Sequence, residues 1–129
     1  MRIVVQRVLE SSVKVDDKIV GKSGKGMMLL VSFTQTDTEK EIDYMVNKVS
    51  NLRIFDDENG IMNLSIKDVG GEILSISQFT LYGDASKGNR PSYIKALNRE
   101  KAIELYDLFN KKLNEIVHTE TGIFGADMK

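Results

Sequence analysis

The sequence predicts an α+β fold in a single domain that spans residues 1–129. Runs of strand-like segments, two segments with apolar residues at helical spacing, and the segregation of those helices from the strands favour this class over a Rossmann type. A chain of this length can form its own hydrophobic core.

The first third of the chain has the pattern of strands. Residues 3–9 are β-branched and apolar, and residues 13–16 alternate with a period of two. Residues 16–18 are typical of a turn that leads into another short strand. Residues 26–33 form a continuous apolar run, which is expected of a strand buried on both faces.

A helix is predicted over residues 38–51. Thr38 and Glu41 have the spacing of a capping box, and apolar residues follow at helical intervals. Short strands are predicted at residues 52–55 and 62–66, on either side of a turn that ends in Asn-Gly.

The longest predicted strand runs over residues 72–82, after a Gly-Gly turn. A polar loop follows at residues 83–91, and its proline is placed to begin a helical turn at residues 92–94. Asn98 caps the second main helix. The apolar face of that helix consists of Ala102, Leu105, Tyr106, Phe109, Leu113 and Ile116. The chain closes with a strand-like segment around residues 122–128.

Composition and charge exclude several classes of protein. Without cysteine, the chain has no disulfide scaffold, thiol nucleophile or thiolate metal site. A net charge of −1 gives no general attraction to long nucleic acid or anionic lipid, so we expect neither a DNA nor a membrane partner. The longest apolar run, residues 27–31, is far shorter than the roughly 20 residues of a spanning helix. No secretory pattern precedes it, and we expect a cytoplasmic location.

Three segments resemble functional motifs only in part. Residues 21–23, Gly-Lys-Ser, lack the earlier glycine of a phosphate-binding loop because Asp16 stands there, and a hairpin turn explains them. His118 has no second histidine or cysteine with which to complete a zinc site, so we expect a partly exposed side chain. The acidic residues 56–58 lack the alternating ligands of a calcium loop. We therefore expect no metal site and no cofactor.

Residues 77–81, Ser-Gln-Phe-Thr-Leu, are a stronger candidate site. The predicted strand has apolar neighbours, yet it carries Ser75, Ser77, Gln78 and Thr80 close together. The loop that follows is locally basic and has backbone freedom, so it could meet a phosphate.

Taken together, these residues resemble the D-aminoacyl-tRNA deacylase (D-Tyr-tRNA deacylase) family along essentially the whole chain. The resemblance rests on residues 77–81, which match the family's first signature, and on Gly-Ile-Phe-Gly-Ala-Asp-Met at residues 122–128. Further similar segments are residues 2–8, 52–57 and 88–92.

The resemblance implies a homodimer with a layered, barrel-like ββα fold of mixed, largely antiparallel sheets, and an active site at the subunit interface. It implies hydrolysis of the ester that joins a D-amino acid, or glycine, to the 3′-terminal adenosine of tRNA. The family's second signature, Asn-x-Gly-Pro-Val-Thr, excludes L-amino acids from the partner's pocket. No part of residues 1–129 matches it, and we expect it to follow Lys129.

The expected site residues fall into two sets. The catalytic set is Ser77, Gln78, Phe79 and Thr80. The substrate-binding set is Arg7, Phe124, Gly125, Ala126 and Met128. Arg7, Lys87 and Arg90 are the local cations expected to meet the acceptor end of the tRNA.

Two mechanisms are open for this site. The Thr80 hydroxyl could act as a nucleophile, but no base adjoins it in sequence. Alternatively, backbone N–H groups of Gln78, Phe79 or Thr80 stabilise the oxyanion while a ribose hydroxyl or a water attacks. We favour the second mechanism because aminoacyl esters are already activated.

Two other functions compete with an esterase of mischarged tRNA. One is a non-catalytic, dimeric module that binds an RNA end or a nucleotide in the same pocket. The other is a structural dimerisation domain. Turnover of a D-aminoacyl ester distinguishes the esterase from both.

Overall fold

A four-stranded mixed sheet lies at the centre of the computed structural model, which describes residues 1–129, and its strand order is β1-β4-β7-β8. The strands are β1 (Arg2–Val8), β4 (Gly26–Ser32), β7 (Glu72–Ser77) and β8 (Thr119–Thr121). β1 is antiparallel to β4, whereas β4 with β7 and β7 with β8 form parallel pairs.

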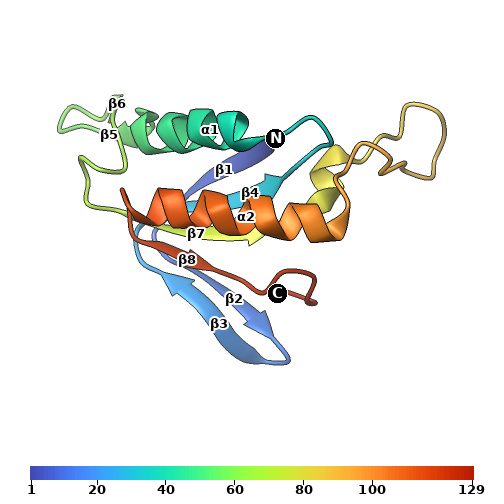
Figure 1. Ribbon diagram of the computed structural model, residues 1–129. Helices are drawn as coiled ribbons and strands as arrows, with labels where there is room; N and C mark the ends of the chain where they lie inside the picture. The colour runs from blue at the N-terminus through green and yellow to red at the C-terminus, as the bar shows by residue number, and fades with distance from the viewer.

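Two helices, α1 (Glu39–Asn51) and α2 (Arg99–Asn114), lie side by side on one face of this sheet (Figure 1). The antiparallel hairpin of β2 (Ser11–Val15) and β3 (Lys18–Ser23) lies on the opposite side. A second, smaller hairpin of β5 (Phe55–Asp56) and β6 (Met62–Leu64) is antiparallel and lies near the end of α1. The α+β prediction, with mixed sheets and two main helices, is confirmed. Neither helix has the length and apolar character needed to cross a bilayer.

The hydrophobic core lies between the sheet and the two helices. In β4, alternate side chains of Met27, Leu29 and Val31 are completely buried, whereas Met28 and Leu30 are half-buried. The expectation of equal burial on both faces is therefore too strong, because β3 packs mainly on β7 and β8. Residues from α1, α2 and neighbouring segments complete the core: Ile42, Val46, Val49, Phe55, Ile66, Ile73, Leu105, Tyr106, Phe109, Leu113 and Val117.

Both helix starts follow their sequence signatures. The Thr38 hydroxyl accepts a hydrogen bond from the Lys40 N–H at 3.3 Å, and the Glu41 carboxylate accepts one from the Thr38 N–H at 2.8 Å. Asn98 accepts a hydrogen bond from the Lys101 N–H at 3.1 Å. These bonds satisfy backbone donors that have no partner inside the helix.

The predicted strand at residues 72–82 is wrong in its second half. β7 ends at Ser77, and the chain then forms a short 3-10 helix, η1 (Phe79–Tyr82). The Gln78 N–H donates to the Val31 carbonyl at 2.8 Å, which continues the ladder with β4 by one residue. β4 itself ends at Ser32, so the chain beyond Gln78 has no neighbouring strand to pair with.

The predicted strand around residues 122–128 is also wrong. β8 covers only Thr119–Thr121, and the following residues form a loop that turns at Gly125, whose φ is 77°. Of the strand predicted at residues 52–55, only Phe55 lies in a strand, the two-residue β5, and the rest of the prediction is wrong.

Two further predictions, both of turns, differ from the structure. Residues 92–94 form no helical turn, because Ser92 pairs with Asp84 through two backbone hydrogen bonds of 2.8 Å. Residues 21–23 lie within β3, while the turn of that hairpin is made by Asp16 and Asp17 at φ values of 50° and 63°.

Candidate active site

A cavity of about 370 Å³ lies where the ends of β4 and β7 meet η1, the start of α2 and the C-terminal loop. Most of its lining is apolar. The lining residues are Ser32, Phe33, Ser77, Phe79, Leu97, Arg99, Ala102, Phe124 and Gly125. Five separate parts of the chain therefore contribute to one cavity.

Two of the four expected catalytic residues line this cavity, and the other two do not. Ser77 and Phe79 line it, and the Phe79 ring packs edge-on against Tyr93 with 5.3 Å between ring centroids. The side chains of Gln78 and Thr80 are exposed and do not line it. The lining therefore takes alternate residues of this segment, as on one face of a strand, although the chain bends into η1 after Ser77.

Two backbone N–H groups at this bend have no acceptor. The first N–H groups of a helix lack an intrahelical partner, and no carbonyl accepts from Phe79 or Thr80. The Gln78 N–H, in contrast, is bonded to Val31 and is not free. Of the three backbone donors expected from the sequence, Phe79 and Thr80 are therefore available.

The C-terminal loop brings part of the expected binding set to the cavity. Phe124 and Gly125 line it, while Ala126 and Met128 are half-buried outside the lining. The Phe124 ring packs against Tyr106 with 5.9 Å between ring centroids. The second aromatic ring fixes one wall of the cavity.

Tyr106 supports this wall from the core. Its hydroxyl donates a hydrogen bond to the Ser75 carbonyl at 2.6 Å. Burial raises the pKa of the Tyr106 hydroxyl, so the group remains a neutral donor at physiological pH.

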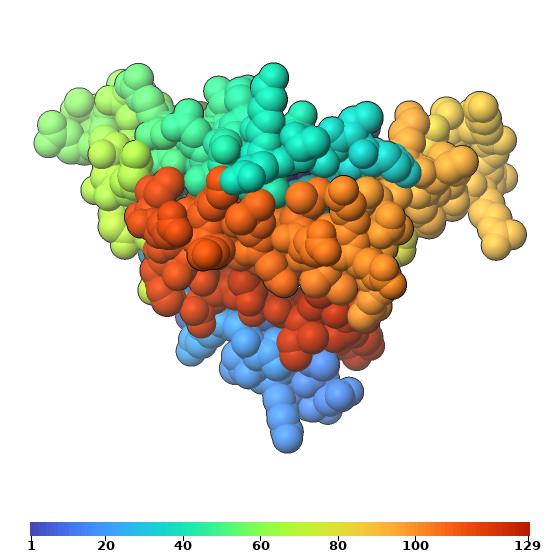
Figure 2. Space-filling model, viewed as in Figure 1, coloured from blue at the N-terminus to red at the C-terminus, as the bar shows by residue number.

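The expected cations do not reach this cavity within one chain. Arg7 pairs in register with Met27, near the other end of β4, and donates to the Ile54 carbonyl at 3.0 Å. Its guanidinium also lies 3.5 Å from Asp56. Lys87 and Arg90 belong to an exposed loop that projects away from the helices and the sheet (Figure 2).

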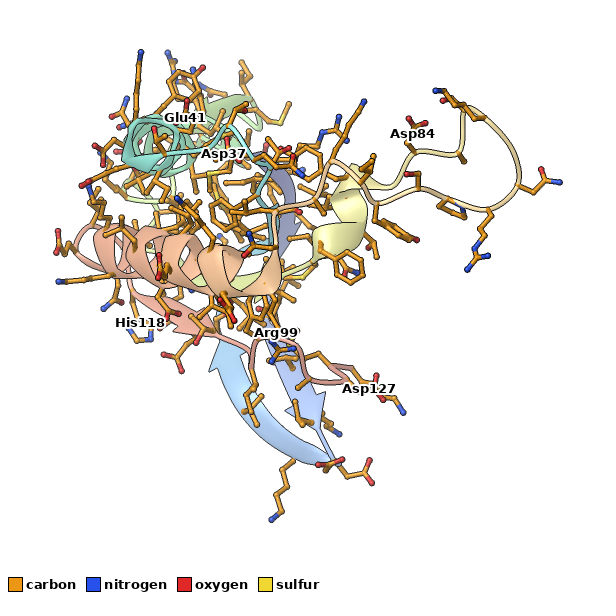
Figure 3. All side chains as sticks on the ribbon, turned by 45° about the vertical axis from the view of Figure 1, so that its right-hand side comes forward. Asp37, Glu41, Asp84, Arg99, His118 and Asp127 are labelled. Atoms are coloured by element: carbon orange, nitrogen blue, oxygen red, sulfur yellow. The ribbon has the colours of Figure 1, made fainter.

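Arg99 is a cavity residue that the sequence reasoning missed. It is the first residue of α2, and its guanidinium carbon lies 5.8 Å from the centroid of the Phe124 ring. Figure 3 shows it beside the C-terminal loop, with His118 toward the other end of the helix. Ser32, at the end of β4, was missed as well. The sequence feature that could have pointed to Arg99 is a positively charged residue at the start of a predicted helix, where the helix dipole disfavours positive charge.

Arg99 is the only charged residue in the lining. His118 lies elsewhere and pairs with Glu120 at 3.1 Å. No group of three or more His, Asp or Glu side chains is arranged to hold a metal ion. The lining thus offers two serine hydroxyls, the free N–H group of Phe79 and one guanidinium, but no side chain that could act as a general base near neutral pH.

Fold and cavity together define an α+β protein with a mostly apolar cavity whose lining includes one arginine. The sequence model of the D-Tyr-tRNA(Tyr) deacylase family matches residues 4–129. The chain belongs to this family.

Individual relatives agree with this assignment. A D-aminoacyl-tRNA deacylase of Kosmotoga olearia is 56% identical over 128 residues, which cover 99% of this chain and 86% of the relative. A D-aminoacyl-tRNA deacylase of Brevibacillus brevis is 55% identical over 129 residues, which cover 99% of this chain and 89% of the relative.

Solved structures share the fold. One is titled c-Myc DNA Unwinding Element Binding Protein and superposes with a TM-score of 0.91 at 38% sequence identity. The match covers 100% of this chain and 89% of the chain in that structure. Another, described as a probable eukaryotic D-amino acid tRNA deacylase, has a TM-score of 0.82 at 17% identity, and the match covers 98% of this chain and 91% of that structure. The second likeness concerns the fold alone.

Proposed function

We propose that this protein hydrolyses the ester bond between a D-amino acid, or glycine, and the 3′-terminal adenosine of tRNA. The products are the free amino acid and tRNA, so the reaction removes mischarged tRNA before translation uses it. One observation carries the proposal: parts of both sequence segments that resemble the deacylase family, residues 77–81 and 122–128, meet at the same cavity.

The composition of the cavity favours a mechanism without a protein nucleophile. The N–H groups of Phe79 and Thr80 stabilise the oxyanion that forms when a water, oriented by the vicinal ribose hydroxyl, attacks the ester carbonyl. The bond from the carbonyl carbon to the ribose oxygen then breaks, and that oxygen takes the proton that the attacking water loses. Removing one such donor typically costs about 3–4 kcal/mol in the barrier.

The active form in this proposal is a cytoplasmic homodimer whose second subunit closes the cavity. Exposed apolar side chains, including Val4, Leu9 and Ile19, give the single chain apolar surface that a partner copy could cover. Sedimentation equilibrium of the full-length protein should give twice the mass of its single chain. A single-chain mass at the concentrations used for catalysis would contradict the dimer.

The function is tested with D-Tyr-tRNA and L-Tyr-tRNA as parallel substrates for the full-length protein. We expect release of D-tyrosine and little release of L-tyrosine. Phe124→Ala should lower kcat/KM at least about tenfold because it removes one wall of the cavity, an effect of about 1.4 kcal/mol. Ile123→Ala is the matched control, since Ile123 is 48% exposed and does not line the cavity.

Other outcomes identify the competing functions. Binding of the tRNA end without turnover by the folded dimer would favour the non-catalytic module, and absence of both would favour a structural dimerisation domain. One structural relative is named for binding a DNA element. The net charge of −1 argues against a large duplex footprint here, and duplex DNA should not compete with the tRNA substrate.

A further inference from the structure

The positive charge of Arg99 is not neutralised within the chain. None of the ion pairs involves it, whereas Arg7 is paired with Asp56. Arg2 and Arg53 each donate to a backbone carbonyl, at 2.8 and 2.9 Å. Arg99 is the guanidinium that lines the cavity and has no partner there.

The C-terminal loop lies against this guanidinium. A Cβ atom at Gly125 would lie 2.5 Å from Nη1 of Arg99, so the end of the arginine side chain would have to move. Gly125 also has a φ of 77°, which favours glycine. The Arg99 side chain is exposed, and its guanidinium carbon lies 5.8 Å from the centroid of the Phe124 ring at the cavity.

Helix stability does not account for a cation at this position. Arg99 begins α2, where the positive end of the helix dipole disfavours positive charge. The same helix end and the guanidinium together favour an anion at the cavity. A function in ligand binding explains the placement better than a structural one.

We propose that Arg99 binds the phosphate on the 5′ side of the terminal adenosine and thereby sets the ester against the start of η1. This inference rests on the proposed function. The substrate's α-amino group carries positive charge near neutral pH and is repelled by Arg99, while its ester and adenine are uncharged. The phosphate is the one anionic group near the reacting bond, and a guanidinium can bind two of its oxygens at once.

The test compares two small substrates: 3′-O-(D-tyrosyl)adenosine and the same ester carrying a 5′-phosphate. For the unaltered protein we expect kcat/KM to be about tenfold or more higher with the phosphate, mainly through KM. Arg99→Gln should remove this preference, and Arg99→Lys should restore part of it. Lys101→Gln is the matched control, because it removes one positive charge from the same helix at a residue that does not line the cavity.

Several results would overturn the inference. Equal kcat/KM for both esters in the unaltered protein would leave the hydrolase intact and remove the role of Arg99. An equal fall of kcat on both esters in Arg99→Gln would place Arg99 on the ester or its oxyanion instead.

A binding measurement separates this inference from the proposed function. If the full-length protein hydrolyses neither ester, the proposed function fails, and calorimetry with 5′-AMP and adenosine still tests Arg99. Tighter binding of 5′-AMP, lost in Arg99→Gln and kept in Lys101→Gln, supports the phosphate site. Equal binding of the two compounds contradicts it.

Discussion

The polar groups that line the cavity are two serine hydroxyls, the N–H group of Phe79 and the Arg99 guanidinium, and the unbonded N–H of Thr80 is next to Phe79 in the chain. A guanidinium is protonated throughout the physiological range and cannot accept a proton from water. In the proposed mechanism, catalysis depends on holding an activated ester against fixed donors, which can contribute several kcal/mol through orientation and electrostatics.

At the residue scale, Thr80→Ala should retain substantial deacylase activity, within a few-fold of the unaltered protein. The Thr80 side chain is exposed and outside the cavity lining, and the substitution keeps the backbone N–H. Steady-state hydrolysis of D-Tyr-tRNA measures the effect. Complete loss in a variant that still folds would make the Thr80 hydroxyl a nucleophile.

Two substitutions at Phe79 test whether its backbone N–H group is an oxyanion donor. Phe79→Ala removes the ring, and Phe79→Pro removes both the ring and the N–H. Proline is tolerated at a first helical position, and the preceding Gln78 is already extended at φ −147° and ψ 90°. We expect Phe79→Pro to be roughly 10²-fold slower than Phe79→Ala. Equal rates would exclude this N–H as an oxyanion donor.

At the scale of elements, the transition from β7 to η1 creates the candidate site. The strand ends because β4 ends, and the new helix begins with two unsatisfied N–H groups, of which that of Phe79 belongs to a residue of the cavity lining. The Arg2 guanidinium lies 4.5 Å from the centroid of the Tyr82 ring and donates to the Leu81 carbonyl at 2.8 Å. These contacts tie the end of η1 to β1.

The capping box of α1 should make stability depend on pH in the acid range. Hydrogen bonds from the Thr38 hydroxyl and then the Thr38 N–H lower the pKa of Glu41 below 4.5. Since the folded-state pKa is the lower one, this stabilisation is present above pH 4.5 and is lost as the pH falls through the folded-state value. Thermal unfolding of the unaltered protein and Glu41→Gln should therefore converge as the pH falls below 4.5. A constant difference in Tm across that range would contradict the prediction.

Gly21 controls how closely the β2-β3 hairpin approaches the main sheet. A Cβ atom there would lie 2.4 Å from the Thr121 carbonyl oxygen of β8, so backbone would have to move. Gly21→Ala should lower the free energy of unfolding by about 1–3 kcal/mol. Urea unfolding measures this, with Gly60→Ala as a control at a turn where no atom lies within 4 Å of the new methyl group. Because Gly60 has a φ of 73°, its own cost reports backbone strain alone.

At the scale of the whole molecule, the net charge of −1 limits how much RNA backbone the protein can bind. Acceptor-end recognition needs one or two phosphates, and Arg99 is placed for one of them. The slope of log K against log salt should then be about −0.7 to −1.4, given roughly −0.7 per phosphate of single-stranded RNA.

Binding of a tRNA with a non-hydrolysable 3′-aminoacyl amide, measured over a range of salt concentrations, tests this footprint. Arg99→Gln should make the slope shallower by about 0.7, and Lys101→Gln should leave it unchanged. A slope steeper than about −4 would indicate an extended contact with the tRNA backbone.

Local signals in the sequence were sufficient for much of the fold. Periodicity and caps predicted both main helices, and the apolar run at residues 26–33 predicted the central strand. Each depends on residues within one or two turns of each other. The predicted ends of β7 and β8 failed because strand length depends on neighbouring strands that are distant in sequence.

By itself, the sequence determined the α+β class, the positions of the main helices and the two segments similar to deacylases. Only the tertiary structure decided that Ser77, Phe79, Phe124 and Gly125 share one cavity while Gln78, Thr80 and Arg7 lie outside it. It also brought Arg99 to that cavity, where its guanidinium lies beside Gly125. The physical reason is that periodicity reports which face of an element is buried. The place where separate elements end and meet is decided by long-range packing.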